Sequence, residues 1–231
     1  MWPRNCEVCG HVVDRPGRHV CSECLNRLPF VPIDGCCRKC GRAVEKLDGE
    51  FLCEECRENR PSFDRAASSL RFEGEAREMV NAFKFRRHLW LRSDFVDWLE
   101  ATANARFRVG EIGVVVAMPT TLAHRLDRGY NQCDYLAAPL AKRLSVPFAK
   151  GAVGRIGRPA RQGSLSEADR RVNVIGTFAV RKPGLLTGRT VLLVDDIMTT
   201  GSSLSECAAE LKRTAKVEKV WCITLARSLR T

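Results

Sequence analysis

Two adjacent aspartates and the loop after them are the first candidates for chemistry in this 231-residue chain. Asp195 and Asp196 follow the apolar run 191–194, and a helical pattern of apolar residues begins at Leu204. The loop between them holds Thr199, Thr200, Gly201, Ser202 and Ser203. Backbone N–H groups and the dipole at a helix N-terminus attract phosphate, and carboxylates accept hydrogen bonds from sugar hydroxyls. The segment therefore predicts a site for a phosphorylated sugar.

A second kind of chemistry is indicated by the cysteines, nine of which lie within the first 56 residues. Eight form the pairs Cys6/Cys9, Cys21/Cys24, Cys37/Cys40 and Cys53/Cys56, whereas Cys36 breaks the spacing. Equivalent cysteines are 31 or 32 residues apart, so this is a two-unit repeat. Four thiolates make a tetrahedral zinc site, and such a small segment needs a metal for stability. We predict one structural zinc ion per repeat; a cross-braced arrangement and metal-free thiols are the alternatives.

Charge is divided unevenly along the chain. Residues 1–60 carry 10 basic and 10 acidic side chains, and residues 61–231 carry 28 and 17, which is the whole net charge of +11. The second part is therefore where a polyanion is expected to bind, either a phosphorylated small molecule, a nucleic acid, or both. No apolar run approaches 18 residues and the start has no signal-like pattern, so we expect no membrane span and a cytoplasmic location.

Three helical segments and three apolar runs must position these candidate residues. The helical segments are 76–83, 133–144 and 204–211, and the apolar runs are 114–117, 191–194 and 220–225. Runs that are apolar on both faces are typical of buried strands in a largely parallel sheet with helices outside. We therefore predict a cysteine-rich zinc module over residues 1–60 and an α/β domain over residues 61–231. Ligands of such sheets bind beyond the carboxyl ends of the strands.

The segment 191–204 resembles the phosphoribosyl-pyrophosphate (PRPP) motif of type I phosphoribosyltransferases: an apolar strand, two acids and a Thr/Gly-rich loop. A plain strand–turn–helix with an aspartate as N-cap is the alternative. Segment 118–132 resembles the ComF family pattern, a proline turn, an arginine and then Arg-Gly-aromatic-Asn-Gln. There Arg125 and Arg128 offer forked donors to a pyrophosphate and Gly129 lets the backbone approach it. A solvated helix-face charge is the alternative for either arginine.

A third segment, 155–178, is similar to the ComF signature Arg…Gln…Arg-x-x-Asn-Val-x-Gly-x-Phe. Residues 142–171 carry 8 basic and 2 acidic side chains. The resemblance implies a mobile hood that closes over PRPP, with Arg158 and Arg161 binding its pyrophosphate. Lys84 stands where the family has a lysine after its first helix, and a surface lysine is the alternative.

The resemblance covers essentially the whole chain and implies a type I phosphoribosyltransferase fold behind a double zinc ribbon. It implies that Asp195 and Asp196 hold the ribose, that the 199–203 loop holds the 5-phosphate, and that Mg²⁺ bridges the ribose and the pyrophosphate. Phosphoribosyl (pentosyl) transfer would make the chain a glycosyltransferase, but no segment of the sequence indicates which molecule would accept the phosphoribosyl group.

Because the family is tied to competence and DNA uptake, a second hypothesis stays open. In it, the chain is a non-catalytic accessory protein that binds single-stranded DNA, works with other competence proteins and uses PRPP or a nucleotide as a regulatory ligand. A third hypothesis is a recruitment protein that binds a partner through its zinc module.

Overall fold

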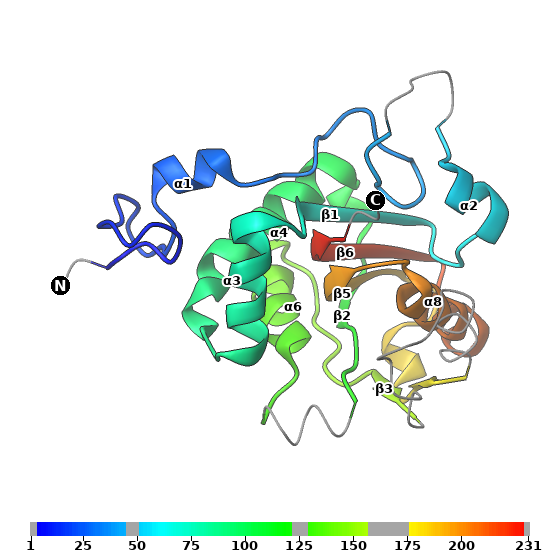
Figure 1. The fold of residues 1–231 in the computed structure, drawn as a ribbon. Coiled ribbons are helices and arrows are strands. Elements are labelled where there is room, and N and C mark those ends of the chain that lie inside the picture. Colours follow the sequence, from blue (N-terminus) through cyan, green and yellow to red (C-terminus); the bar gives the residue numbers. More distant parts are fainter. Residues whose placement is uncertain (1–3, 45–50, 122–128, 157–175, 229–231) are drawn as a thin grey trace.

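Four parallel strands in the order β1-β6-β5-β2 form the central sheet of the computed structural model, and β3 and β4 pair antiparallel beside it (Figure 1). The structure describes residues 4–44, 51–121, 129–156 and 176–228. The strands are β1 (Arg65–Arg71), β2 (Val114–Ala117), β3 (Val153–Arg155), β4 (Phe178–Val180), β5 (Thr190–Met198) and β6 (Lys219–Arg227). The fold class is therefore α/β with a mostly parallel sheet, as predicted.

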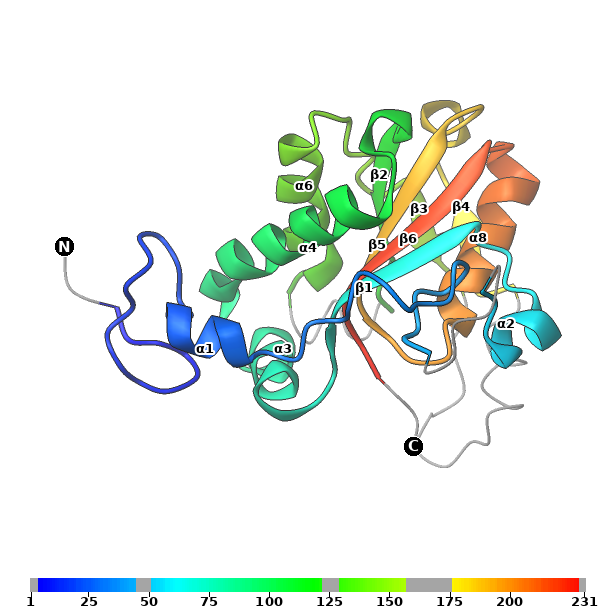
Figure 2. The same ribbon diagram turned by 90° about the horizontal axis from the view of Figure 1, so that it is seen from above.

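Helices cover both faces of this sheet (Figure 2). α4 and α6 pack against each other on one face, and α8 lies on the other. The α-helices are α1 (Ser22–Arg27), α2 (Glu54–Asn59), α3 (Gly74–Phe85), α4 (Arg92–Arg106), α6 (Gln132–Arg143) and α8 (Ser202–Ala215). The three helical segments predicted from apolar spacing correspond to α3, α6 and α8, and the predicted segment 133–144 extends one residue beyond α6, to its C-cap Leu144. Within the described residues, no helix combines the length and the apolar character needed to cross a bilayer.

β1 and α4 are among the elements that were not predicted, because they lack a clear apolar pattern. β1 carries Ser68 and Ser69 in its buried part. Their hydroxyls bond to Thr224 Oγ1 at 2.7 Å and to Thr102 Oγ1 at 2.8 Å. Because each buried hydroxyl finds a partner on a neighbouring element, the strand tolerates polar residues that hide its pattern in the sequence.

The strand that carries the aspartates is longer than its apolar run. β5 continues through Met198 because β6 keeps pairing with it beyond Val194: Asp195 is opposite Thr224, and Met198 is opposite Arg227. The two aspartates thus belong to the last residues of the strand instead of following it.

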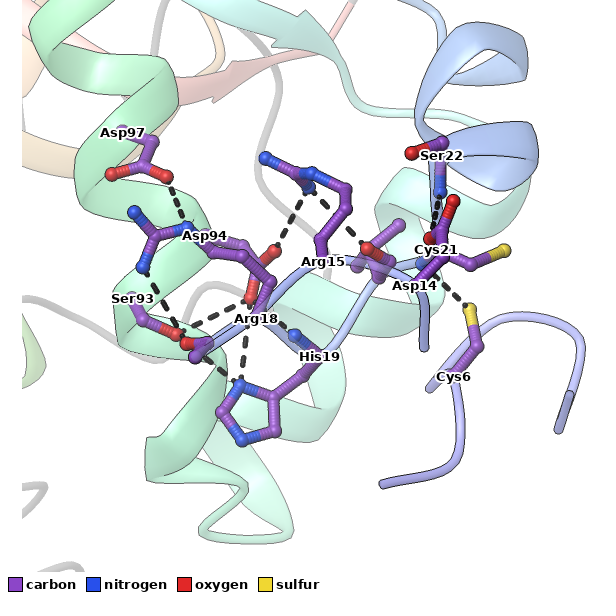
Figure 3. Close-up of polar contacts among 12 residues, drawn as sticks. Cys6, Asp14, Arg15, Arg18, His19, Cys21, Ser22, Ser93, Asp94 and Asp97 are labelled. Carbon is purple, nitrogen blue, oxygen red and sulfur yellow. Dashed lines mark hydrogen bonds and ion pairs between the residues drawn. The ribbon is translucent and has the colours of Figure 1, made fainter. Parts of the chain in front are cut away.

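The first half of the cysteine repeat docks on α4 through polar contacts (Figure 3). Asp94 of α4 is fully buried and accepts from the backbone N–H of His19 at 2.9 Å and from Arg15 Nη1 at 3.4 Å. Arg18 Nε lies 2.5 Å from the carboxylate of Asp97. His19 is half-buried against α4, because its backbone and ring both face polar groups of that helix.

The second half of the repeat packs on the sheet itself. Lys39 O accepts from the N–H of Ala66 in β1 at 2.7 Å. Gly41 approaches the same strand so closely that a Cβ there would lie 2.6 Å from Ala66 O. The linker between the halves covers the outer edge of β1, where the N–H of Val31 donates to Ser69 O. The two halves of the zinc module thus lie towards opposite ends of the molecule (Figures 1 and 2).

Candidate functional site

The eight paired cysteines form two clusters, one for each half of the repeat. The clusters are Cys6, Cys9, Cys21 and Cys24, and Cys37, Cys40, Cys53 and Cys56, with all ligand atoms of a cluster within 4.8 Å of one another. Sulfur atoms around a tetrahedral Zn²⁺ with Zn–S bonds of about 2.3 Å lie about 3.8 Å apart. The Cys9–Cys21 and Cys40–Cys53 sulfur distances are 3.8 Å and 3.7 Å. The donor sets fit one structural zinc ion per repeat, as predicted, and do not match a cross-braced arrangement.

In each cluster, backbone N–H groups donate to one sulfur atom, that of Cys6 or Cys37. Val8 and Cys21 each donate to Cys6 Sγ at 3.4 Å, and Cys53 donates to Cys37 Sγ at 3.3 Å. Burial opposes ionisation of Cys6, but the N–H groups outweigh it and lower its pKa to about 7. Zinc binds the thiolate, so this lowering favours metal binding in neutral solution. Cys36 lies outside both clusters, and its Sγ donates to Pro32 O at 3.2 Å.

Of the two aspartates, Asp196 is held more firmly, by contacts from two helices. Its carboxylate lies 3.0 Å from Lys84 Nζ of α3 and accepts from Gln132 Nε2 of α6 at 2.8 Å. Lys84 has only 16% of its side chain exposed, so it is not the solvated surface lysine of the alternative interpretation. α3, α6 and β5, which are far apart in sequence, therefore meet at this carboxylate.

Asp195 has a different environment. Its Oδ1 accepts from the N–H of Asp196 at 2.9 Å and from Cys133 Sγ at 3.3 Å. Burial and the charge of Asp196 raise the pKa of Asp195 to about 7. Burial and the neighbouring carboxylate also raise the pKa of Cys133 well above its usual value, so it stays a thiol that can donate. The two adjacent carboxylates thus have different environments: Asp196 is paired with a cation, whereas Asp195 changes its protonation near neutral pH.

The hydroxyl loop turns directly from β5 into α8. Gly201 has a φ of +79°, a conformation that favours glycine, and a Cβ there would lie 2.5 Å from Met198 Cε, so the Met198 side chain would have to shift. α8 begins at Ser202, and the N–H of Ser202 donates to Thr200 Oγ1 at 3.3 Å. N–H groups in the first turn of a helix have no partner within the helix. The predicted phosphate-binding residues therefore lie at a helix N-terminus next to the aspartates.

The pyrophosphate-binding residues predicted from sequence are described only in part. Arg125, Arg128, Arg158 and Arg161 lie outside the described residues. Gly129 has a φ of +81°, a conformation that favours glycine. The residue Asn131 caps α6, because its side chain accepts from the N–H of Cys133 at 3.2 Å and donates to Met118 O at 3.0 Å. These bonds join the carboxyl end of β2 to the helix that carries Gln132.

A cavity of about 200 Å³ lies beside this junction and adds three basic residues that were not predicted as a group. It is lined by Pro119 and Asn131 and by the cations Lys150, Arg155 and Arg181. Burial lowers the pKa of Arg155, and the charge of Asp195 opposes that change. No local motif distinguishes Lys150 or Arg181, because only the folded β3–β4 pair brings them to β2. Gln132 did have a signal, since it belongs to the Arg-Gly-aromatic-Asn-Gln pattern.

Two family models match the chain. One described as a phosphoribosyl transferase domain matches residues 131–231, and one described as a double zinc ribbon domain matches residues 1–60. Among solved structures, the chain is similar to a glutamine PRPP amidotransferase of Bacillus subtilis (TM-score 0.39, 19% identity, 58% of this chain and 25% of that chain). It is also similar to adenine phosphoribosyltransferase of Saccharomyces cerevisiae (TM-score 0.38, 19% identity, 61% and 72%).

Named relatives match nearly the full length. The chain is 29% identical over 213 residues to competence protein F of Haemophilus influenzae, with 90% of each chain covered. It is 27% identical over 193 residues to the DNA utilization protein YhgH of Escherichia coli K12 (81% of this chain, 82% of the relative). It is 25% identical over 235 residues to competence protein ComFC of Bacillus subtilis (93% and 86%). The zinc-ribbon and phosphoribosyltransferase models thus match the two ends of one chain that aligns with these relatives over most of its length, so the chain is similar to the ComF family of competence-associated proteins in both parts, as the sequence resemblance predicted.

Proposed function

We propose that the chain binds PRPP or a related phosphoribosyl ligand at the carboxyl end of β5. Asp195 and Asp196 take the ribose hydroxyls, and the Thr199–Ser203 loop takes the 5-phosphate. The observation that carries the proposal is the Asp196 carboxylate, fixed by Lys84 and Gln132 beside the N-terminus of α8. The buried Oε1 of Gln132 has no partner within the described part of the chain. A ribose hydroxyl would give this acceptor the donor it lacks.

The pyrophosphate group is proposed to lie towards the basic cavity. Lys150, Arg155 and Arg181 line it, and they would add to the predicted set of Arg125, Arg128, Gly129, Arg158 and Arg161. Mg²⁺, when bound, would neutralise charge on the departing pyrophosphate. Because the Lys84 ammonium already neutralises Asp196, we propose that the ion is held mainly by oxygen atoms of the ligand, with Asp195 and Asp196 nearby.

Calorimetry of the zinc-loaded protein with PRPP and Mg²⁺ tests the binding proposal. We expect wild type to bind and the double variant Asp195→Asn/Asp196→Asn to lose roughly 100-fold or more in affinity, since each removes hydrogen bonds to a charged acceptor. Asp97→Asn, which changes a partly exposed carboxylate of α4 that pairs with Arg18 and Arg143, is the matched control and should bind like wild type. Absence of heat with wild type, or normal binding by the double variant, would contradict the proposal.

The raised pKa of Asp195 makes two pH predictions. Its carboxylate accepts from a ribose hydroxyl best when ionised, so PRPP affinity should rise between pH 6 and pH 8 and lose this dependence in Asp195→Asn.

The pKa of Asp195 in the folded state, about 7, lies above the ordinary value of 3.8. The protonated carboxyl therefore contributes to the free energy of unfolding below pH 3.8, and this contribution is lost as the pH rises through 7. At pH 8, Asp195→Asn should be more stable than wild type, by at most about 4 kcal/mol. Chemical denaturation at pH 5 and pH 8 measures this difference.

Transfer of the phosphoribosyl group would be a second step at the same site. An acceptor would form a bond to C1 of the ribose while the bond from C1 to pyrophosphate breaks. A pyrophosphate-release screen over nucleobases and amines, with the double asparagine variant as blank, measures whether such turnover occurs and identifies the acceptor.

Single-stranded DNA binding is a second candidate function, supported by a basic cluster beside the second zinc site. Burial lowers the pKa of Arg65, and so do the nearby guanidinium groups of Arg106, Arg38 and Arg108. Arg38, Lys39 and Arg65 line a cavity of about 310 Å³. The relatives named for DNA utilization and competence make the phosphate backbone of DNA a fitting polyanion.

Affinity for a fluorescent oligonucleotide, measured over a range of salt concentrations, tests the DNA candidate. The variant Arg65→Ala/Arg108→Ala should bind more weakly and with a salt slope reduced by about 1 to 2. Neutralising Arg158, Arg161, Arg170 and Arg171 tests the loop predicted from sequence in the same way. The double asparagine variant should keep normal DNA affinity, since its changes lie at the phosphoribosyl site.

The setting of this function is proposed from the chemistry of the thiolates. Zinc–thiolate sites and unpaired thiols are typical of a reducing compartment, so we propose that the chain acts in the cytoplasm with other competence proteins. We also propose that residues 1–60 and 61–231 are its two domains. Fractionation of native cells and expression of residues 61–231 alone test these two statements.

A further inference from the structure

Arg227, the last residue of β6, is a buried cation in an unusual position. Only 1% of it is exposed, and within the described residues it forms no ion pair with a carboxylate. Its Nη1 donates to the backbone carbonyl of Cys40 at 2.5 Å, and its buried Nε has no partner there. Burying a guanidinium with so few acceptors is unfavourable. The carbonyl of Cys40, a zinc ligand of the second cluster, is therefore a contact on which this side chain depends.

The other neighbour of Arg227 leads to the phosphate loop. Arg227 Nη1 lies 3.7 Å from Met198 Sδ, and the N–H of Ser228 donates to Met198 O at 2.9 Å. The methyl group of Met198 in turn fills the space where Gly201 lacks a side chain. Met198 immediately precedes the Thr199–Ser203 loop, so a movement of Arg227 would change the support of that loop.

A cavity of about 170 Å³ separates the second zinc cluster from the loop. Cys40 and Cys56 line it on the zinc side, and Thr200, Gly201 and Ser202 line it on the loop side. Arg227 and Met198 line the same cavity. The two regions are therefore partly divided by open space, and these two side chains bridge them.

We propose that Arg227 is a positioning residue through which the second zinc site sets the conformation of the phosphate loop. Zinc bound by Cys40 fixes the carbonyl that Arg227 needs, Arg227 then holds Met198, and Met198 supports the turn at Gly201. Loss of the metal frees the carbonyl and leaves the guanidinium without its acceptor, so the loop loses its support. The identity of the ligand rests on the proposed function, but the coupling between zinc site and loop does not.

The variant Arg227→Met in the full-length, zinc-loaded protein tests this coupling, because methionine fills a similar volume without burying a charge. We expect ribose 5-phosphate affinity, measured by calorimetry, to fall roughly 3- to 30-fold. Hydrogen exchange of the amides in 199–203 should become faster while zinc content stays at that of wild type. Arg15→Met is the matched control, since it removes a partly buried arginine from the first repeat, and both readouts should stay at wild-type values.

A double-mutant cycle with the zinc site decides whether Arg227 carries the effect. Cys56→Ser should weaken ribose 5-phosphate binding in the wild-type background and have little further effect in Arg227→Met. The inference is overturned if Arg227→Met keeps wild-type affinity and loop exchange, or if the two effects add fully. If wild type does not bind ribose 5-phosphate, the proposed function fails, and loop exchange in Arg227→Met still decides the coupling.

Discussion

The two halves of the zinc module have nearly the same sequence spacing and very different surroundings. The first docks on the helical face through the side chain of Asp94, which contacts Arg15 and the backbone N–H of His19 (Figure 3). Glu7 adds a contact with His88 at 3.1 Å. The second docks on the sheet through backbone groups, at Lys39 O and Cys40 O. A duplicated ligand pattern thus provides two structurally similar metal sites, and tertiary contacts give only the second one a place beside the phosphate loop.

Removing one zinc site at a time should produce the largest difference between the two halves. We expect Cys37→Ala to lower the melting temperature of the whole protein by on the order of 10 °C or more, because zinc stabilises a segment that is bonded to β1 and buried against β6. Cys6→Ala should unfold the first half locally and leave the main transition nearly unchanged. Thermal unfolding with zinc analysis measures both. Equal losses from the two variants would mean that the halves contribute alike.

The buried carboxylate of Asp94 provides the next test. Asp94→Ala should destabilise the docked first half by about 3 kcal/mol, since it leaves Arg15 and the N–H of His19 without their buried acceptor. Hydrogen exchange of the amides of His19 and Val20 should rise accordingly. Ribose 5-phosphate affinity should not change, and a loss of affinity would show that the first half also communicates with the loop.

A glycine follows the first cysteine pair in each half of the zinc module, and replacing it by alanine adds a single methyl group. Gly10 and Gly41 have φ values of +77° and +71°, so alanine is strained at both by about 1 kcal/mol. Only at Gly41 would the new Cβ meet backbone, 2.6 Å from Ala66 O. Gly41→Ala should therefore cost about 2–4 kcal/mol in unfolding free energy and Gly10→Ala about 1. Chemical denaturation measures both, and equal costs would contradict the close packing on β1.

Prediction from sequence worked best where one short segment carries the whole signal. The cysteine pairs predicted the ligand sets because each zinc site is built from residues within one half of the repeat. The run 114–117 coincides with β2, since its residues are apolar on both faces. The contact between Lys84 and Asp196 was not predicted, because these residues are 112 positions apart and the side chain of Lys84 reaches the end of β5 only in the folded chain.

The sequence alone determined the two metal sites, the α/β class and the order of acids, hydroxyls and glycine at the start of α8. All of these depend on residue type and local spacing, which the chain carries before it folds. Two features depend on the tertiary structure and could not be predicted from the sequence. Asp196 pairs with a lysine whereas Asp195 does not, and the second zinc cluster lies beside the phosphate loop. The first feature arises because α3 and α6 bring Lys84 and Gln132 to the end of β5. The second arises because parallel pairing of β1, β5 and β6 brings Cys40, Met198 and Arg227 together from distant parts of the chain.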